Sequence, residues 1–89
     1  MEAGREMDAM IAERVMGWIK RRQTDIPHYS TDIAAAFAVV EEMDCGFIQW
    51  DVGIFEVELT KECITGFATA DTLPLAICRA ALKAIEEEA

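Results

Sequence analysis

The hydrophobic pattern changes its period near Phe47, and this change restricts the chain to folds that combine helices with a sheet. From Phe55 to Leu59, apolar residues alternate with glutamates, which is typical of a half-buried strand. Before residue 47 and after residue 71, apolar residues recur at intervals of three and four, which is typical of amphipathic helices. The pattern therefore predicts strands in the middle of the chain and helices on both sides.

Turn and capping residues divide these regions into six elements. We expect one helix over residues 6–19, a second that starts at Ser30 and is ended by Cys45-Gly46, and a third over 72–87. Three strands are expected over 47–52, 54–60 and 63–69, and their short connections make neighbouring strands antiparallel. The prediction is a single α+β domain over residues 1–89, ordered α-α-β-β-β-α, with helices packed on a three-stranded antiparallel sheet.

The same pattern assigns capping and core positions. Ser30 or Thr31 is the expected N-cap of the second helix, with Asp32 in its first turn. Asp71 or Thr72 is expected to cap the third helix. On the last strand, Phe67 is expected to point into the core together with Cys63 or Ile64. The expected buried stripe of the second helix comprises Ile33, Ala36, Phe37, Val40 and Met43.

Size, charge and cysteine content restrict the class of protein. The chain has 89 residues, enough for one small core, and its net charge of -9 disfavours binding to nucleic acid or to an anionic membrane surface. The longest apolar run, Ile33–Val40, is too short to cross a bilayer, and the acidic N-terminus does not resemble an export signal. Three cysteines without a close pair favour a reducing compartment, so we expect a cytoplasmic protein.

Residues able to carry chemistry are present but are explained by structural roles. His28 and Ser30 lie two positions apart, yet a nucleophile and its base also need an orienting group and an oxyanion site. The three cysteines and His28 are too widely spaced for a structural zinc site. Asp32 and Asp71 open helices, where capping accounts for them. We therefore expect no catalytic residue, metal or cofactor, and a protein that is not an enzyme.

Three stretches of the sequence carry a family resemblance, namely ERVMGW at residues 13–18, STDIAAA at 30–36 and ADTLPLAICRAAL at 70–82. They resemble the phage ABA sandwich domain family, whose members are small proteins of phages and prophages. The connection over residues 20–29 is shorter, and poorer in aromatic and acidic residues, than is usual for the family. The resemblance implies an α/β/α sandwich and a phage or prophage origin, and it implies no reaction.

Large apolar residues near the first strand indicate a possible interface. Ile48, Trp50 and Val52 share the face of the strand opposite Phe47, and Trp18 is a further large apolar residue in the first helix region. If helices cover only the other face, these residues form an exposed patch, for which a second copy of the chain is the simplest partner. If helices cover both faces, the patch is buried within the monomer. We expect a homo-oligomer, most simply a dimer.

The sequence supports three hypotheses for the function. The first is a non-enzymatic phage or prophage accessory protein that acts in the host cytoplasm through protein binding or self-association. The second is an acidic inhibitor of a host defence or DNA-processing protein, in which the glutamates at 41, 42, 56, 58, 62 and 86–88 mimic a phosphate backbone. The third is a small-molecule sponge, which requires a pocket at the oligomer interface lined by Lys20 to Arg22 or by Trp18.

Overall fold

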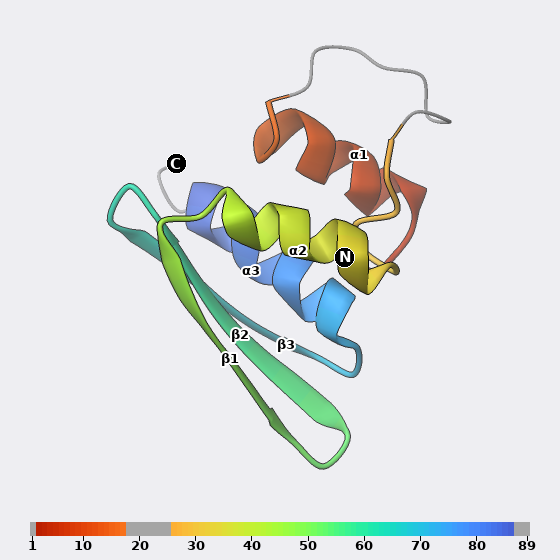
Figure 1. Cartoon of the computed structure of the whole chain (residues 1–89), viewed down its shortest axis with the longest axis vertical. Coiled ribbons are helices and arrows are strands. Elements are labelled where there is room, and N and C mark those ends of the chain that lie inside the picture. The colour runs from red at the N-terminus through yellow and green to blue at the C-terminus, as the bar shows by residue number, and fades with distance from the viewer. Residues whose placement is uncertain (1, 18–25, 87–89) are drawn as a thin grey trace.

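The computed structural model describes residues 2–17 and 26–86, and these residues form three helices and three strands (Figure 1). The observed order confirms the predicted α-α-β-β-β-α sequence of elements. Trp18, Ile19 and the basic residues Lys20 to Arg22 lie outside the described residues. The elements are α1 (Arg5–Arg14), α2 (Ile33–Glu41), β1 (Cys45–Asp51), β2 (Ile54–Lys61), β3 (Ile64–Ala70) and α3 (Leu73–Glu86).

The three strands form one antiparallel sheet in the order β1-β2-β3, so that β1 and β3 are its two edges. Ile48 lies opposite Val57, which in turn lies opposite Ala68. The next row contains Phe47, Glu58 and Phe67 on the other face of the sheet. The alternation predicted for β2 is confirmed, because Val57 and Leu59 are buried.

The described helices lie on one side of the sheet, and together with it they form an α+β sandwich (Figure 1). Helix α3 packs on β3 and β2, whereas α2 and α1 pack on α3. The β1–β2 hairpin extends past the helices at its turn end (Figure 1). Within the part of the chain that the structure describes, no helix is long and apolar enough to span a membrane.

Small residues set the distance between α3 and the sheet. A Cβ atom at Gly66 would lie 2.2 Å from the carbonyl oxygen of Ala80 and 2.4 Å from the backbone nitrogen of Ala84. Both contacts are with helix backbone, so that neither neighbour can rotate away. Glycine on β3 and alanines on α3 therefore allow the helix to lie directly on the strand.

This close approach explains why the prediction for Phe67 is wrong. Phe67 is 50% exposed and shares its face with Glu58, whereas Gly66 and Ala68 point toward α3. A phenylalanine side chain does not fit beneath a helix that already touches the strand backbone. Cys63 is also exposed, because it lies in the turn before β3.

The N-cap, the last residue and the buried residues of α2 also differ from the prediction. Asp32 is the N-cap, and its side chain accepts a hydrogen bond of 3.2 Å from the backbone N–H of Ala34. The helix ends at Glu41, and Cys45 and Gly46 already belong to β1. Ile33 and Phe37 are 40% and 44% exposed, because α2 contacts α3 through a narrow stripe. The buried residues at this contact and just after it are Ala36, Val39 and Met43.

Candidate functional site

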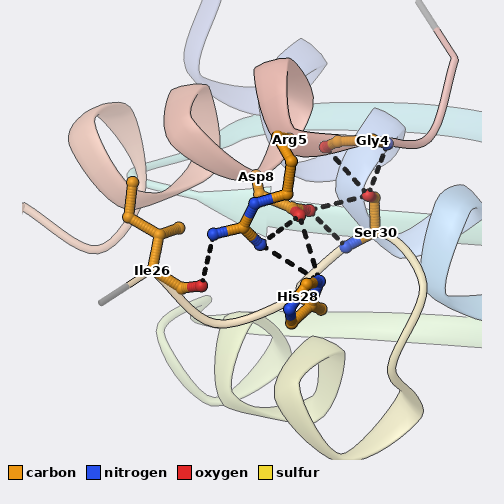
Figure 2. Close-up of polar contacts among 6 residues, drawn as sticks. All are labelled: Gly4, Arg5, Asp8, Ile26, His28 and Ser30. Carbon is orange, nitrogen blue, oxygen red and sulfur yellow. Dashed lines mark hydrogen bonds and ion pairs between the residues drawn. The ribbon is translucent and has the colours of Figure 1, made fainter. Parts of the chain in front are cut away.

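A buried carboxylate, Asp8 of α1, is the centre of the most extensive group of polar contacts (Figure 2). Asp8 is 1% exposed, and its Oδ1 atom accepts hydrogen bonds from the Ser30 backbone N–H at 2.8 Å and from the Ser30 hydroxyl at 2.7 Å. Its Oδ2 atom accepts a hydrogen bond of 3.0 Å from Arg5. The carboxylate therefore connects the first turn of α1 to the segment that precedes α2.

Arg5 strengthens the same connection. One guanidinium nitrogen, Nη2, donates to the carbonyl oxygen of Ile26 at 2.9 Å, and Nη1 lies 3.1 Å from Nδ1 of His28 (Figure 2). The side chain of His28 is 65% exposed, and its Nδ1 lies 4.0 Å from Oδ2 of Asp8. The Arg5 guanidinium thus places a positive charge against the buried carboxylate, which is the arrangement that a buried charge requires.

Ser30 acts at the start of α1 and not as the N-cap of α2. It is 1% exposed, and its Oγ lies 2.9 Å from the backbone nitrogen of Gly4, which donates to it. Gly4 is the N-cap of α1 and has no side chain with which to cap the helix. The prediction that Ser30 caps α2 is wrong because its hydroxyl is engaged with α1, which leaves that role to Asp32.

The arrangement of serine, aspartate and histidine is not that of an activated nucleophile. In a catalytic triad the serine hydroxyl donates to the histidine, which in turn donates to the carboxylate. Here Ser30 donates to Asp8 itself, and its hydroxyl is buried away from any substrate. The geometry is that of a buried anchor for α1.

The sequence interpretation missed Asp8 and Arg5. The available signal was a charged residue in the buried stripe of α1, where Asp8 lies between Met7 and Ile11. The acidic residue at that position fits a first helical turn, which hid its second role.

Buried titratable groups next to this anchor are held in their neutral forms. Burial raises the pKa of Cys78 to about 12, and the nearby Asp8 carboxylate adds to the rise. Burial also raises the pKa of Tyr29, with smaller contributions from Asp8 and Cys78. A thiol with such a pKa is a poor nucleophile and a poor metal ligand. Within residues 2–17 and 26–86, no group of three or more His, Cys, Asp or Glu side chains is placed to hold a metal ion.

The candidate interface residues fall into three groups. Ile48 is half-buried and packs against the core, whereas Trp50 is 71% exposed and Val52 is 97% exposed. Trp18 lies outside the described residues. Ile48 and Trp50 share the face on which the helices pack, and the helices cover that face only in part. The exposed residues near β1 form what we call the β1 surface, which comprises Phe47, Trp50 and Val52.

An open cleft lies between α1, β3 and α3. Its volume is about 510 Å³, and Met7 and Met10 of α1 face Ala68 and Thr69 of β3 across it. Arg79 and Lys83 of α3 also line the cleft, and Arg79 donates a hydrogen bond of 3.1 Å to the carbonyl oxygen of Thr69. The cleft therefore combines apolar walls with two cationic side chains.

Comparison with known proteins shows a family and a solved structure to which this chain is similar. The family model of the phage ABA sandwich domain matches residues 9–82. The structure is similar to the 2.0 Å crystal structure of a phage protein from Bacillus cereus, with a TM-score of 0.81 and 25% sequence identity. That similarity covers 96% of this chain and 93% of the other. No curated protein sequence matches the chain.

Proposed function

The chain belongs to the phage ABA sandwich domain family, and we propose that it is a non-enzymatic phage accessory protein that acts by self-association through the β1 surface. The proposal places it in the cytoplasm of a bacterial host. The observation that carries the proposal is the exposure of Trp50, at 71%, beside a half-buried Ile48 on an edge strand. Exposed aromatic residues are enriched in protein interfaces, and Trp50 lies on the same face of β1 as the apolar Ile48.

Two properties, one of the polar contacts around Asp8 and one of the neighbouring Cys78, support a role without catalysis. The hydroxyl of Ser30 is committed to Asp8 and Gly4, so it is not available as a nucleophile. The thiol of Cys78 is buried and its pKa is raised to about 12, so it stays protonated at neutral pH. Ser30 and Cys78 therefore support a structural role for this region of the molecule.

Light scattering after size-exclusion chromatography tests the proposal directly. The unmodified protein is expected to elute with at least twice the 9.9 kDa mass of one chain. Trp50→Ser is expected to weaken association by at least tenfold, and Phe67→Ser is the matched control because it removes a half-exposed aromatic ring from the opposite edge strand. A single-chain mass for the unmodified protein at all concentrations would contradict self-association.

The cleft favours a second candidate function, the binding of a small anionic molecule with an apolar part. The side chains of Met10 and Leu82 in the cleft offer apolar contact. Lys83 places a positive charge at the wall of the cleft, in a protein whose net charge is -9. Native mass spectrometry of protein purified gently from its host would detect such a molecule as extra low mass. Lys83→Glu is expected to abolish that extra mass, and bare protein in every preparation would contradict this function.

A further inference from the structure

β1 lacks the features by which proteins usually protect an edge strand. It spans seven residues, contains neither proline nor lysine, and has one charged residue, Asp51, at its end. Every residue of β1 except Ile48 is exposed. A long and exposed edge with a charge only at its end offers a row of backbone groups to which another strand can pair.

The register of β1 on β2 determines which of its backbone groups face the open edge. Asp51 and Ile54 close a two-residue hairpin, and the closing pair of such a hairpin is hydrogen-bonded. Hydrogen-bonded and non-hydrogen-bonded pairs alternate along an antiparallel ladder, so Gln49 also directs its N–H and C=O toward β2. The open edge therefore receives the N–H and C=O groups of Gly46, Ile48 and Trp50.

These three residues make β1 complementary to itself. If two copies pair antiparallel about Ile48, Ile48 faces its own copy and Trp50 faces Gly46 of the second copy. Gly46 is exposed and has no side chain, so that the indole ring of one chain covers the backbone of the other. All seven residues of β1 are then paired, with about six hydrogen bonds between the two strands.

We propose that two copies of this chain join through β1 in this antiparallel register, with a twofold axis at Ile48, so that two three-stranded sheets become one sheet of six strands. The inference rests on the proposed function, because it specifies the geometry of self-association at the β1 surface. A twofold contact uses the same strand from both chains and closes at two copies, which predicts a dimer.

The charges on the sheet favour edge pairing over packing of two outer faces. Phe47 and Phe67 are 74% and 50% exposed on the outer face, but Glu58 lies between them and Glu56 lies in the next row. Two packed outer faces would bring two carboxylates from each copy into one region with little water. Edge pairing leaves these carboxylates in solvent and places Asp51 opposite the uncharged Cys45.

Disulfide cross-linking measures the register. In a background of Cys45→Ser and Cys63→Ser, which keeps only the buried Cys78, we would introduce Ile48→Cys, Phe47→Cys or Gln49→Cys singly. Residues that face each other across a hydrogen-bonded pair have Cα atoms about 5.5 Å apart, within reach of a disulfide. In the proposed register a cysteine at 47 or 49 is about 8 Å from its own copy, which is too far.

The expected result is that Ile48→Cys dimers cross-link under mild oxidation at least tenfold faster than dimers of either control. Faster cross-linking through position 47 or 49 would overturn the proposed axis. A dimer that cross-links through none of the three positions would overturn edge pairing and leave self-association standing, whereas a protein that stays monomeric would overturn both.

A second variant keeps the test decisive if Ile48→Cys does not fold. Trp50→Lys changes an exposed side chain, and it places a charge where the indole is proposed to cover Gly46 of the second copy. Dimerisation is expected to weaken by more than tenfold, while Phe67→Lys leaves it unchanged. The reverse order of effects would indicate contact through the outer face and would overturn edge pairing.

Discussion

The two edge strands, β3 and β1, share β2 as a neighbour but differ in how the helices cover them. On β3, Gly66 and Ala68 are buried beneath α3, and α1 lies across the cleft from the same strand. On β1, the corresponding face carries Ile48 and Trp50, and Trp50 remains 71% exposed. Small residues allow a helix of the same chain to cover β3, whereas the helices leave the large side chain of Trp50 exposed on β1.

Gly66→Ala tests the covered edge most severely. The added Cβ would lie 2.2 Å from the Ala80 carbonyl oxygen, so α3 and β3 must separate. We expect the free energy of unfolding to fall by about 3 kcal/mol, at the upper end of the usual cost of overpacking. Urea unfolding followed by circular dichroism measures this change.

Gly46→Ala is the matched variant on the open edge. Its Cβ would lie 2.6 Å from a side-chain carbon of Leu59 and 2.7 Å from the carbonyl oxygen of Glu58. The Leu59 side chain can rotate, and among the described residues β1 packs mainly on β2 and not on a helix, so we expect roughly half the loss. Equal losses at the two glycines would contradict the contrast between a covered and an open edge.

Asp8→Ala should loosen α1 and thereby expose the surface of α3 on which α1 packs. The change removes the acceptor of hydrogen bonds from Arg5 and from the backbone and hydroxyl of Ser30. Removing the acceptor that these three donors share is expected to cost about 2 kcal/mol of stability. Because α1 packs on α3, this loosening should expose apolar surface, and the variant should also associate more strongly than the unmodified protein.

Ser30→Ala is the milder partner of that variant. It removes the hydroxyl but keeps the backbone N–H that donates to Asp8, so about half the loss of stability is expected. Chemical denaturation and light scattering measure stability and association in both variants. If Asp8→Ala unfolds at the same urea concentration as the unmodified protein, the buried cluster does not anchor α1.

The helix that covers β3 should weaken in alkali. Burial raises the pKa of Cys78 on α3 from 9.0 to about 12, so the unfolded chain loses this proton at a lower pH than the folded chain. The stability from the neutral thiol is therefore complete below pH 9 and is lost as the pH rises toward 12, by at most about 1.4 kcal/mol per pH unit. Urea unfolding at several pH values between about 8 and 11 measures this slope.

Cys78→Ala should flatten this dependence, and Cys63→Ser, which changes an exposed thiol, should leave it intact. A slope should remain above pH 10 in Cys78→Ala, because the pKa of Tyr29 is also raised by burial. An unchanged slope in Cys78→Ala would show that the buried thiol does not control the loss of stability.

The order of elements could be predicted from the sequence because it depends on local pattern. The alternation from Phe55 to Leu59 and the turn at Gly53 determine β2 and its hairpin without reference to the rest of the chain. The direction of Phe67 could not be predicted, since it depends on how closely α3 approaches β3. The sequence pattern shows which residues alternate between the two faces of a strand. Which of the two faces is buried depends on where the helix packs.

The contact between Asp8 and Ser30 could not be predicted from the sequence for a similar reason. Asp8 and Ser30 are 22 residues apart, and no local pattern connects them. Ser30 before a helix satisfies the usual rule for an N-cap, and Asp32 two positions later satisfies it equally well. Which of the two residues caps α2 depends on the buried carboxylate of a different helix.

The smallest predicted effect concerns the two hairpin turns, one between β1 and β2 and the other between β2 and β3. The β2–β3 turn places Glu62 and Cys63 at φ values of 52° and 70°, whereas the β1–β2 turn has a glycine, Gly53, at 74°. Left-handed backbone costs a side chain about 1 kcal/mol, and glycine avoids this cost. Cys63→Gly should therefore raise the free energy of unfolding by about 0.5 kcal/mol once the flexibility of glycine in the unfolded chain is included.

Gly53→Ala makes the opposite change at the other turn and should lower stability by about 1 kcal/mol. Nothing lies within 4 Å of the Cβ that this substitution adds, so the loss reports backbone strain alone. Thermal unfolding of the two variants therefore compares the hairpins without a packing contribution at Gly53. If Cys63→Gly lowers the melting temperature instead, contacts of the cysteine side chain outweigh the strain of the left-handed backbone.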